Sequence, residues 1–186
     1  MSDPLEDILK KASEGDLNAF ESIYKSTSQF VYNVAFRIVS NREDAEEVTQ
    51  EVFLNVYHSL KEFRFQSSFK TWVYRIAVNC ALNRVKKTSK ERSQTVEYDE
   101  RLNPVATAHA AEAQMEKEHN EKMITWLLQS LNPDQRSCVV LRNMQGLSYQ
   151  EIADVLKINV NTVRSRLKRA REALMNVKKE AQKNAL

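Results

Sequence analysis

Glycine, proline and cysteine are scarce in this chain of 186 residues, which has 2 Gly, 3 Pro and 2 Cys. So few turn-forming residues, together with the lack of alternating β-branched runs, argue against a sheet-rich fold with many tight turns. Cys80 and Cys138 lie far apart within apolar helical patterns, so we expect both to be reduced core residues. The composition therefore favours an all-α fold.

Signatures of catalysis and of metal or cofactor binding are also missing. His58, His109 and His119 lack the spacing of metal ligands, and the sequence has no glycine-rich phosphate loop and no nucleophile–base pattern. We therefore expect no enzyme activity of the chain alone, no metal and no cofactor. No apolar run approaches the length that crosses a bilayer, and the N-terminus lacks a signal peptide's apolar stretch, so we expect a cytoplasmic protein.

Charge is distributed unevenly along the chain, although the formal net charge is only +3. Basic residues dominate segments 70–92 and 159–186, whereas acidic residues dominate segment 43–62. Two basic surfaces and one acidic surface predict two nucleic-acid contacts and a separate protein contact.

The clearest motif is a helix-turn-helix over residues 147–175. Ser148 and Glu151 are spaced as a capping box, which fixes the start of the first helix, and residues 157–159 interrupt the apolar pattern before Val160 restarts it. The second helix has an apolar stripe and a basic face, which alone could also be a solvated face. With the cap and the turn, it predicts major-groove binding by residues near the helix N-terminus and along the basic face: Asn161, Thr162, Arg164, Ser165, Arg166, Lys168 and Arg169.

An acidic helix is expected from Asn41 to about residue 60, with Asn41 as its N-cap. Acidic residues in a first turn are favourable capping in themselves, because the helix dipole attracts them. The alternative interpretation is a docking face for a basic or polar partner.

The connector at 63–69 reads FRFQSSF, in which the phenylalanines either plug the core or are exposed for stacking. Ser67 or Ser68 is expected to cap the following helix, over 69–87. Phe69 and Trp72 begin its inward stripe, and a polar face opposite carries Arg75, Asn79, Asn83 and Lys86 or Lys87. Cations and amides beside aromatic rings suit single-stranded or distorted DNA, although the aromatic residues taken alone are more typical of a core than of a stacking surface.

Segment 88–119 is poor in apolar residues and is expected to be a flexible linker, with helix forming from Ala106 onward. The predicted organisation is two small helical domains, 1–87 and 120–186, joined by this linker. In the second domain Asn132 should cap a helix that starts at Pro133, and Trp126 and Met144 are expected in the core.

The sequences DAEEVTQEVFLNVY and FKTWVYRIAVNCALNRVKK, followed by the helix-turn-helix, together resemble the extracytoplasmic-function group of the sigma-70 family. These proteins are promoter-recognition subunits of bacterial RNA polymerase; LuxR-type regulators share only a similar helix-turn-helix. The resemblance implies three partners: the β′ and β subunits of core polymerase, promoter DNA, and an inhibitory anti-sigma factor, which in this family is often membrane-anchored.

The resemblance also implies roles for individual residues. The acidic helix would bind polymerase through Asp44, Glu47, Gln50, Glu51, Phe53 and Leu54. The connector and the next helix would melt and hold the promoter −10 element through Phe63, Arg64, Phe65, Gln66, Ser67, Lys70, Trp72, Arg75, Asn79, Asn83 and Lys86. The basic helix of the helix-turn-helix would read the −35 element. The connector often reads Phe-Arg-Gly-Asp-Ser in the family; because Phe65 and Gln66 replace Gly-Asp here, the identity of the captured base stays open.

Two other functions fit parts of the pattern. A conventional transcription regulator would use residues 1–87 as an effector or dimerisation domain and bind its duplex site alone. A general nucleic-acid-binding protein would show steep salt dependence with little sequence preference.

Overall fold

The computed structural model describes residues 4–94 and 112–183. Every regular element in these two ranges is helical, which confirms the predicted all-α class. The expected onset of helix at Ala106 lies outside the described residues.

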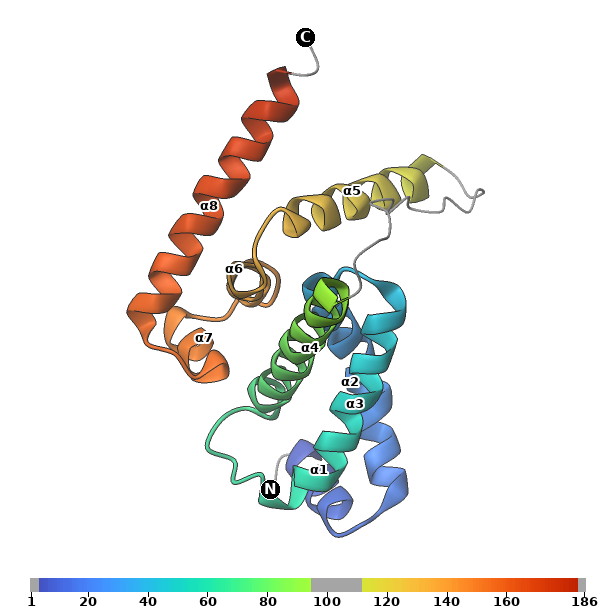
Figure 1. The fold of residues 1–186 in the computed structure, drawn as a ribbon. Helices are drawn as coiled ribbons and strands as arrows, with labels where there is room; N and C mark the ends of the chain where they lie inside the picture. The colour runs from blue at the N-terminus through green and yellow to red at the C-terminus, as the bar shows by residue number, and fades with distance from the viewer. Residues whose placement is uncertain (1–3, 95–111, 184–186) are drawn as a thin grey trace.

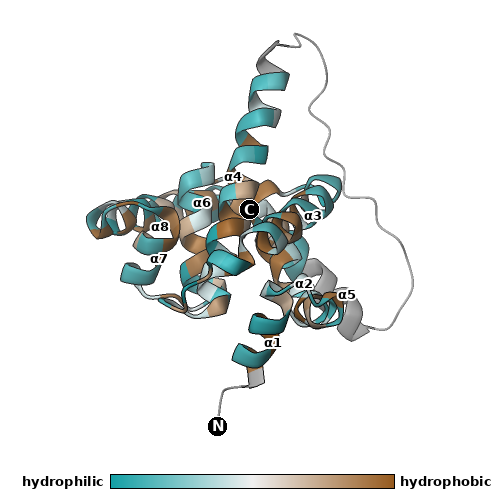
Figure 2. Ribbon diagram, turned by 90° about the horizontal axis from the view of Figure 1, so that it is seen from below, coloured by the Kyte–Doolittle hydropathy of each residue, from teal (hydrophilic) through white to brown (hydrophobic). Residues whose placement is uncertain are grey.

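The first helical body consists of α1 (Pro4–Ser13), α2 (Leu17–Val39), α3 (Arg42–Ser59), the short 3₁₀ helix η1 (Leu60–Glu62) and α4 (Phe69–Gln94). Helices α2, α3 and α4 pack against one another, and their apolar faces meet in the core (Figures 1 and 2). Asn41 caps α3 as predicted, because its side chain accepts the Asp44 backbone N–H at 2.9 Å. Ser68 caps α4 by accepting the Thr71 N–H at 3.1 Å.

Helix α4 continues through Gln94, beyond residue 87, where the sequence pattern loses its apolar stripe. Its last turns are hydrophilic and project away from the bundle (Figure 2). The N-terminal half of α4 supplies the buried residues Val73, Ala77 and Ala81, so one end of the helix is core and the other is polar surface. Cys80 is a buried free thiol, and Cys138 in the second body is another, as predicted.

The second helical body consists of α5 (Glu112–Gln129), α6 (Pro133–Val139), the π-helical turn η2 (Val140–Met144), α7 (Tyr149–Leu156) and α8 (Val160–Lys183). The predicted helix-turn-helix is present as α7 and α8. Ser148 accepts the Glu151 N–H at 3.2 Å while the Glu151 carboxylate accepts the Ser148 N–H at 2.7 Å, which completes the capping box. Asn132 caps α6, with Pro133 at its first position.

Two core assignments in the second body are wrong. The side chain of Trp126 is 51% exposed and that of Met144 is 37% exposed. Leu128 and the half-buried Ile124, one turn before it, face inward from α5. Trp126 is two residues from Leu128, a rotation of about 200° around the helix, so it remains at the surface.

The two bodies are in direct contact. Helix α7 lies along α4, and α6 touches both α2 and α4, as the central position of α6 in Figure 1 indicates. A flexible linker alone would leave the bodies independent, so this packing is a feature that the sequence pattern did not predict.

Candidate nucleic-acid and polymerase interfaces

The basic face of α8 is open to solvent. Arg164, Ser165, Lys168 and Arg169 are exposed, and Asn161 is exposed at the start of the helix. Asn159 caps α8 by accepting the Asn161 N–H at 2.8 Å, and the Arg164 guanidinium donates to the Asn161 side chain at 3.1 Å. Polar and cationic groups therefore gather at the helix N-terminus, the end that reaches base edges in helix-turn-helix proteins.

Arg166 does not share this exposed face. Its Nη2 lies 2.9 Å from Asp134 Oδ2 of α6, and only 23% of its side chain is exposed. Two residues along a helix correspond to a rotation of about 200°, which carries Arg166 from the face of Arg164 toward α6. We therefore assign Arg166 to the packing of α8 on α6. Thr162 is half-buried.

The connector before α4 holds an aromatic cluster. The ring centroid of Phe63 lies 4.7 Å from that of Phe65, 5.2 Å from Trp72 and 5.8 Å from Phe69. Phe69 is buried and Phe65 is 51% exposed, so the phenylalanines both plug the core and reach solvent. Phe65 has φ 56°, a left-handed conformation that costs a non-glycine residue about 1 to 2 kcal/mol. Phe65 occupies the position at which the Phe-Arg-Gly-Asp-Ser pattern noted above has glycine.

The polar face of α4 carries Asn79, Asn83 and Lys86, all exposed. Lys70 is exposed near the start of the helix, where its Nζ lies 5.7 Å from the centre of the Tyr74 ring. Trp72 and Arg75 are half-buried, and the Trp72 ring packs against Phe63 and Phe69 of its own body. The predicted residues of α4 thus fall into an exposed set and a partly covered set, of which Trp72 and Arg75 are the covered members.

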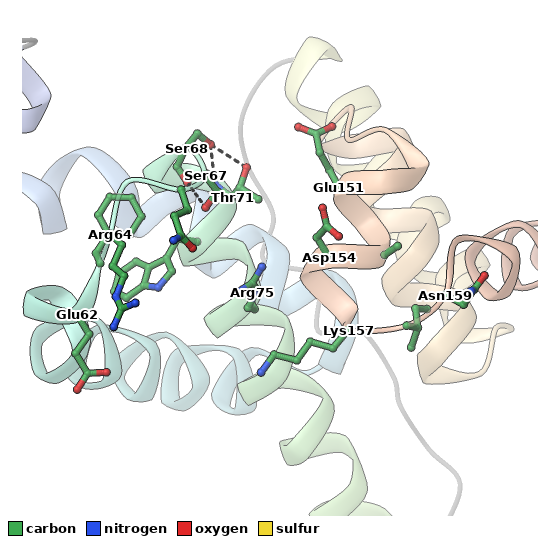
Figure 3. Close-up of a pocket in the computed structure, with 15 residues that line it drawn as sticks. Glu62, Arg64, Ser67, Ser68, Thr71, Arg75, Glu151, Asp154, Lys157 and Asn159 are labelled. Carbon is green, nitrogen blue, oxygen red and sulfur yellow. Dashed lines mark hydrogen bonds between the residues drawn. The ribbon is translucent and has the colours of Figure 1, made fainter.

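The covered set lines a cleft of about 900 Å³ between the two bodies. Arg64, Ser67 and Arg75 stand on one side, and Glu151, Asp154 and Lys157 of α7 and the following turn stand on the other (Figure 3). Gln66 and Trp72 belong to the first wall. The Nε of Arg75 is buried and has no hydrogen-bond partner.

Part of the acidic face of α3 is ion-paired with α4. Arg84 contacts both Asp44 and Glu47 at 2.5 Å, and the hydrogen bond to Asp44 is the main reason why the pKa of Arg84 is raised. Gln50, Glu51 and Leu54 remain exposed, Leu54 at 61%. Phe53 is only 5% exposed and packs edge-on against Tyr24 at 4.6 Å, so its predicted place on the contact surface is corrected to the core beneath it.

A second concavity, an apolar groove of about 1050 Å³, crosses the outer side of the second body. Trp126, Leu127, Leu167 and Leu174 contribute apolar surface to it, and cations also line it: Lys122, Arg142, Arg171 and Lys178. Sequence reasoning missed this groove because it placed Trp126 in the core.

The thiols are poor nucleophiles. Burial is the main cause that raises the pKa of Cys80 to about 11 and that of Cys138 to about 11. Among the described residues, no cluster of three or more histidine, cysteine, aspartate or glutamate side chains could hold a metal ion. None of the helices in these residues is long and apolar enough to cross a membrane.

Comparison with known proteins places both bodies in one family. The model of "Sigma-70 region 2" matches residues 23–91, and that of "Sigma-70, region 4" matches residues 122–174. The ECF RNA polymerase sigma-E factor of Escherichia coli strain K12 is 35% identical over 184 residues, covering 95% of this chain and 96% of that protein. The chain belongs to the extracytoplasmic-function sigma factors of the sigma-70 family.

Other relatives of this sigma factor agree. The RNA polymerase sigma-H factor of Pseudomonas aeruginosa is 33% identical over 173 residues, covering 90% of each chain. The fold matches CnrH in complex with the cytosolic domain of CnrY, with a TM-score of 0.67, 21% identity and coverage of 96% of this chain and 99% of that one. It also matches the sigma factor RpoE in complex with the anti-sigma factor NepR from Bartonella quintana, with a TM-score of 0.64, 22% identity and coverage of 86% and 96%.

Two residues that bridge the bodies of this sigma factor were not predicted. Arg136 is 8% exposed and reaches α2, while Tyr74 is 1% exposed and donates a hydrogen bond to Gln145. Neither residue stands out in a sequence motif, because its partner lies far along the chain.

Proposed function

We propose that this sigma factor divides promoter recognition between its two bodies and relies on core polymerase for the chemistry of RNA synthesis. The observation that carries the proposal is that one chain presents two separate polar faces suited to nucleic acid: the cationic face of α8 and the exposed asparagines of α4. The first suits duplex DNA and the second suits unpaired bases beside an aromatic cluster.

In this proposal Asn161, Arg164, Ser165, Lys168 and Arg169 bind the −35 element in the major groove. The N-terminal residues of α8 read base edges, and Lys168 and Arg169 bind phosphates or bases further along the groove.

The −10 element is bound by the connector and α4. Trp72 and Phe65 offer rings on which unpaired bases stack, Asn79 and Asn83 offer hydrogen bonds to base edges, and cations hold the backbone. The cations of this set are Arg64, Lys70, Arg75 and Lys86.

Core polymerase binds two surfaces in this proposal. Gln50, Glu51 and Leu54 of α3 bind the β′ subunit, since Leu54 offers exposed apolar surface among polar and acidic groups. The apolar groove between α5 and α8 binds the β subunit; its cationic surroundings favour an acidic amphipathic helix, whose apolar side would cover Trp126.

An anti-sigma factor is the proposed regulator. One of the solved structures named above is a complex of the sigma factor RpoE with the anti-sigma factor NepR, which supports a partner of this kind. Because polymerase acts on chromosomal DNA, we propose that the chain works in the cytoplasm.

Reconstitution with bacterial core polymerase tests the function. We expect promoter-specific run-off transcription only when the chain and core are combined, and only weak promoter binding by the chain alone. A conventional regulator would instead bind its duplex site tightly without polymerase. A nonspecific nucleic-acid-binding protein would bind scrambled DNA equally well, with a steep salt dependence. Either result would overturn the proposal.

A further inference from the structure

Arg84 joins α4 to α3 through a double ion pair. Its Nε donates to Asp44 Oδ1 at 2.6 Å, its Nη2 lies 2.5 Å from the same oxygen, and its Nη1 lies 2.5 Å from Glu47 Oε2. All three guanidinium nitrogens are therefore engaged. The side chain of Asp44 is 18% exposed and that of Arg84 is 27% exposed, so water and salt screen this contact less than they screen a surface ion pair.

The ion pair is one end of a polar row between α3 and α4. One turn before Arg84, the thiol of Cys80 accepts a hydrogen bond from the side-chain amide of Asn55 at 3.4 Å. The partners of Arg84 precede Asn55 on α3, whereas Arg84 follows Cys80 on α4, so the two helices run in opposite directions along the row. Contacts at both ends of the row define how far α4 is shifted along α3.

Small apolar side chains are buried along this stretch of both helices. Ala45 and Val48 of α3 are buried, as are Ala77 and Ala81 of α4. Apolar burial has no preferred direction, so it holds the helices together without selecting one position of α4 along α3. Hydrogen bonds from a planar guanidinium to two carboxylates are directional, and they do select one position.

The anchored side of α4 lies next to the side proposed to bind −10 bases. Asn79 and Asn83 are exposed, and each directly precedes a member of the polar row, Cys80 or Arg84. Consecutive residues are separated by a rotation of about 100° around a helix, so any shift or rotation of α4 against α3 moves both amides together. Helix α3 carries the surface proposed for the β′ subunit, so the polar row sets where the amides stand relative to polymerase.

We propose that Arg84 is a positioning residue for promoter opening, which acts through Asp44 and Glu47 to hold the base-binding amides of α4 at a fixed place relative to α3. The inference rests on the proposed roles of α3 and α4. It gives the two carboxylates a new role, because the sequence placed them in the polymerase contact and here they bind Arg84. Arg84 itself touches neither DNA nor polymerase in this role.

Asp44→Ala distinguishes this role from two alternatives. If Arg84 were a phosphate contact restrained by Asp44, removing the carboxylate would free a cation beside the DNA and speed opening. If Asp44 bound polymerase directly, the affinity for core would fall. If Asp44 holds Arg84 in place, opening slows while the affinity for core is unchanged, and Arg84→Ala has the same effect.

Two matched controls remove the same charges without touching the polar row. Glu43→Ala removes an exposed carboxylate from the same first turn of α3. Arg42→Ala removes an arginine whose ion pair, to Glu46 at 3.0 Å, stays within α3. Arg84→Lys is a milder variant that keeps the charge but not the planar fork, and it carries the test should Arg84→Ala fail to fold.

Both steps are measured with the full chain. Core affinity is obtained by titrating the fluorescently labelled chain with bacterial core polymerase. Opening is followed at saturating core by permanganate reactivity of −10 thymines, on a promoter that the wild-type holoenzyme opens. We expect Asp44→Ala and Arg84→Ala to open the promoter about 10- to 100-fold more slowly, the loss typical of a misplacement of about 1 Å, with core affinity unchanged. Arg84→Lys should lie between Arg84→Ala and wild type, and both controls should match wild type.

The same measurements in an Asn79→Ala/Asn83→Ala background separate positioning from a general loss of structure. If Arg84 acts through the two amides, Arg84→Ala has little further effect there, whereas a general defect slows opening by the same factor in both backgrounds. Equal factors, faster opening by Asp44→Ala, or reduced core affinity would each overturn the positioning role. Normal opening by Arg84→Ala and Arg84→Lys, with slow opening in the asparagine background, would overturn the inference and leave the −10 role of α4 in place. Normal opening in the asparagine background would refute that −10 role, and the inference with it.

Discussion

Arg164 and Arg166 allow a sharp test of the proposed −35 face, because they are two residues apart on α8 and have opposite surroundings. Arg164 is exposed, and its guanidinium donates a solvent-exposed hydrogen bond to the Asn161 side chain at 3.1 Å. Arg166 is ion-paired with Asp134 at 2.9 Å, with 23% of its side chain exposed. Replacing each with alanine removes the same charge from the same helix but different interactions.

The expected magnitudes follow from these surroundings. If Arg164 reads a base edge, Arg164→Ala weakens −35 binding by about 1 to 3 kcal/mol, or about 5- to 150-fold, and changes the free energy of unfolding by less than about 0.5 kcal/mol. Arg166→Ala breaks a partly exposed ion pair, so it lowers the free energy of unfolding by about 0.2 to 1 kcal/mol and leaves DNA affinity nearly unchanged.

The assay compares two duplexes bound by reconstituted holoenzyme at one fixed salt concentration. One duplex carries a −35 element selected by the wild-type holoenzyme, and the other carries a scrambled element. Thermal denaturation of the same variants reports stability. Equal losses of affinity for both duplexes would demote Arg164 to a phosphate contact. A loss for Arg166→Ala as large as that for Arg164→Ala would refute our division of the two arginines.

Three further predictions concern other parts of the chain. Asn79→Ala should slow promoter opening while sparing binding to core polymerase, because Asn79 is exposed on α4; unchanged permanganate reactivity of the −10 thymines would contradict this role. Leu54→Ala should weaken core binding with little loss of stability, whereas Phe53→Ala should lower the free energy of unfolding by about 3 to 5 kcal/mol, as measured by urea denaturation; the reverse pattern would show that the buried ring had been misplaced. Cys80 and Cys138 should resist thiol reagents at pH 8 in the native chain and react after unfolding, because burial raises both pKa values from 9.0 to about 11. The raised pKa values favour the protonated thiols in the folded state, so their contribution to the free energy of unfolding is fully present below pH 9 and is lost as the pH rises through about 11. Rapid labelling of the native chain at pH 8 would contradict the burial of the two thiols.

Local interactions could be predicted from the sequence. The caps at Ser148 and Asn132 join atoms three residues apart, so residue type and spacing suffice to identify them. The exposed positions of the α8 cations could also be predicted, because the helical repeat places them opposite the apolar stripe of the same helix. Periodicity gives the faces of a helix but not the neighbours that cover each face, which is why Trp126 was placed in the core and Phe53 on the surface.

Contacts between the bodies were beyond sequence reasoning. Arg136 and Ile38 are 98 positions apart, and Tyr74 and Gln145 are 71 positions apart. An arginine in a short helix and a tyrosine in an amphipathic one have many local explanations, so nothing in their spacing identifies a partner in another part of the chain. Arg166 shows the same limit within one body, since Asp134 lies 32 positions before it.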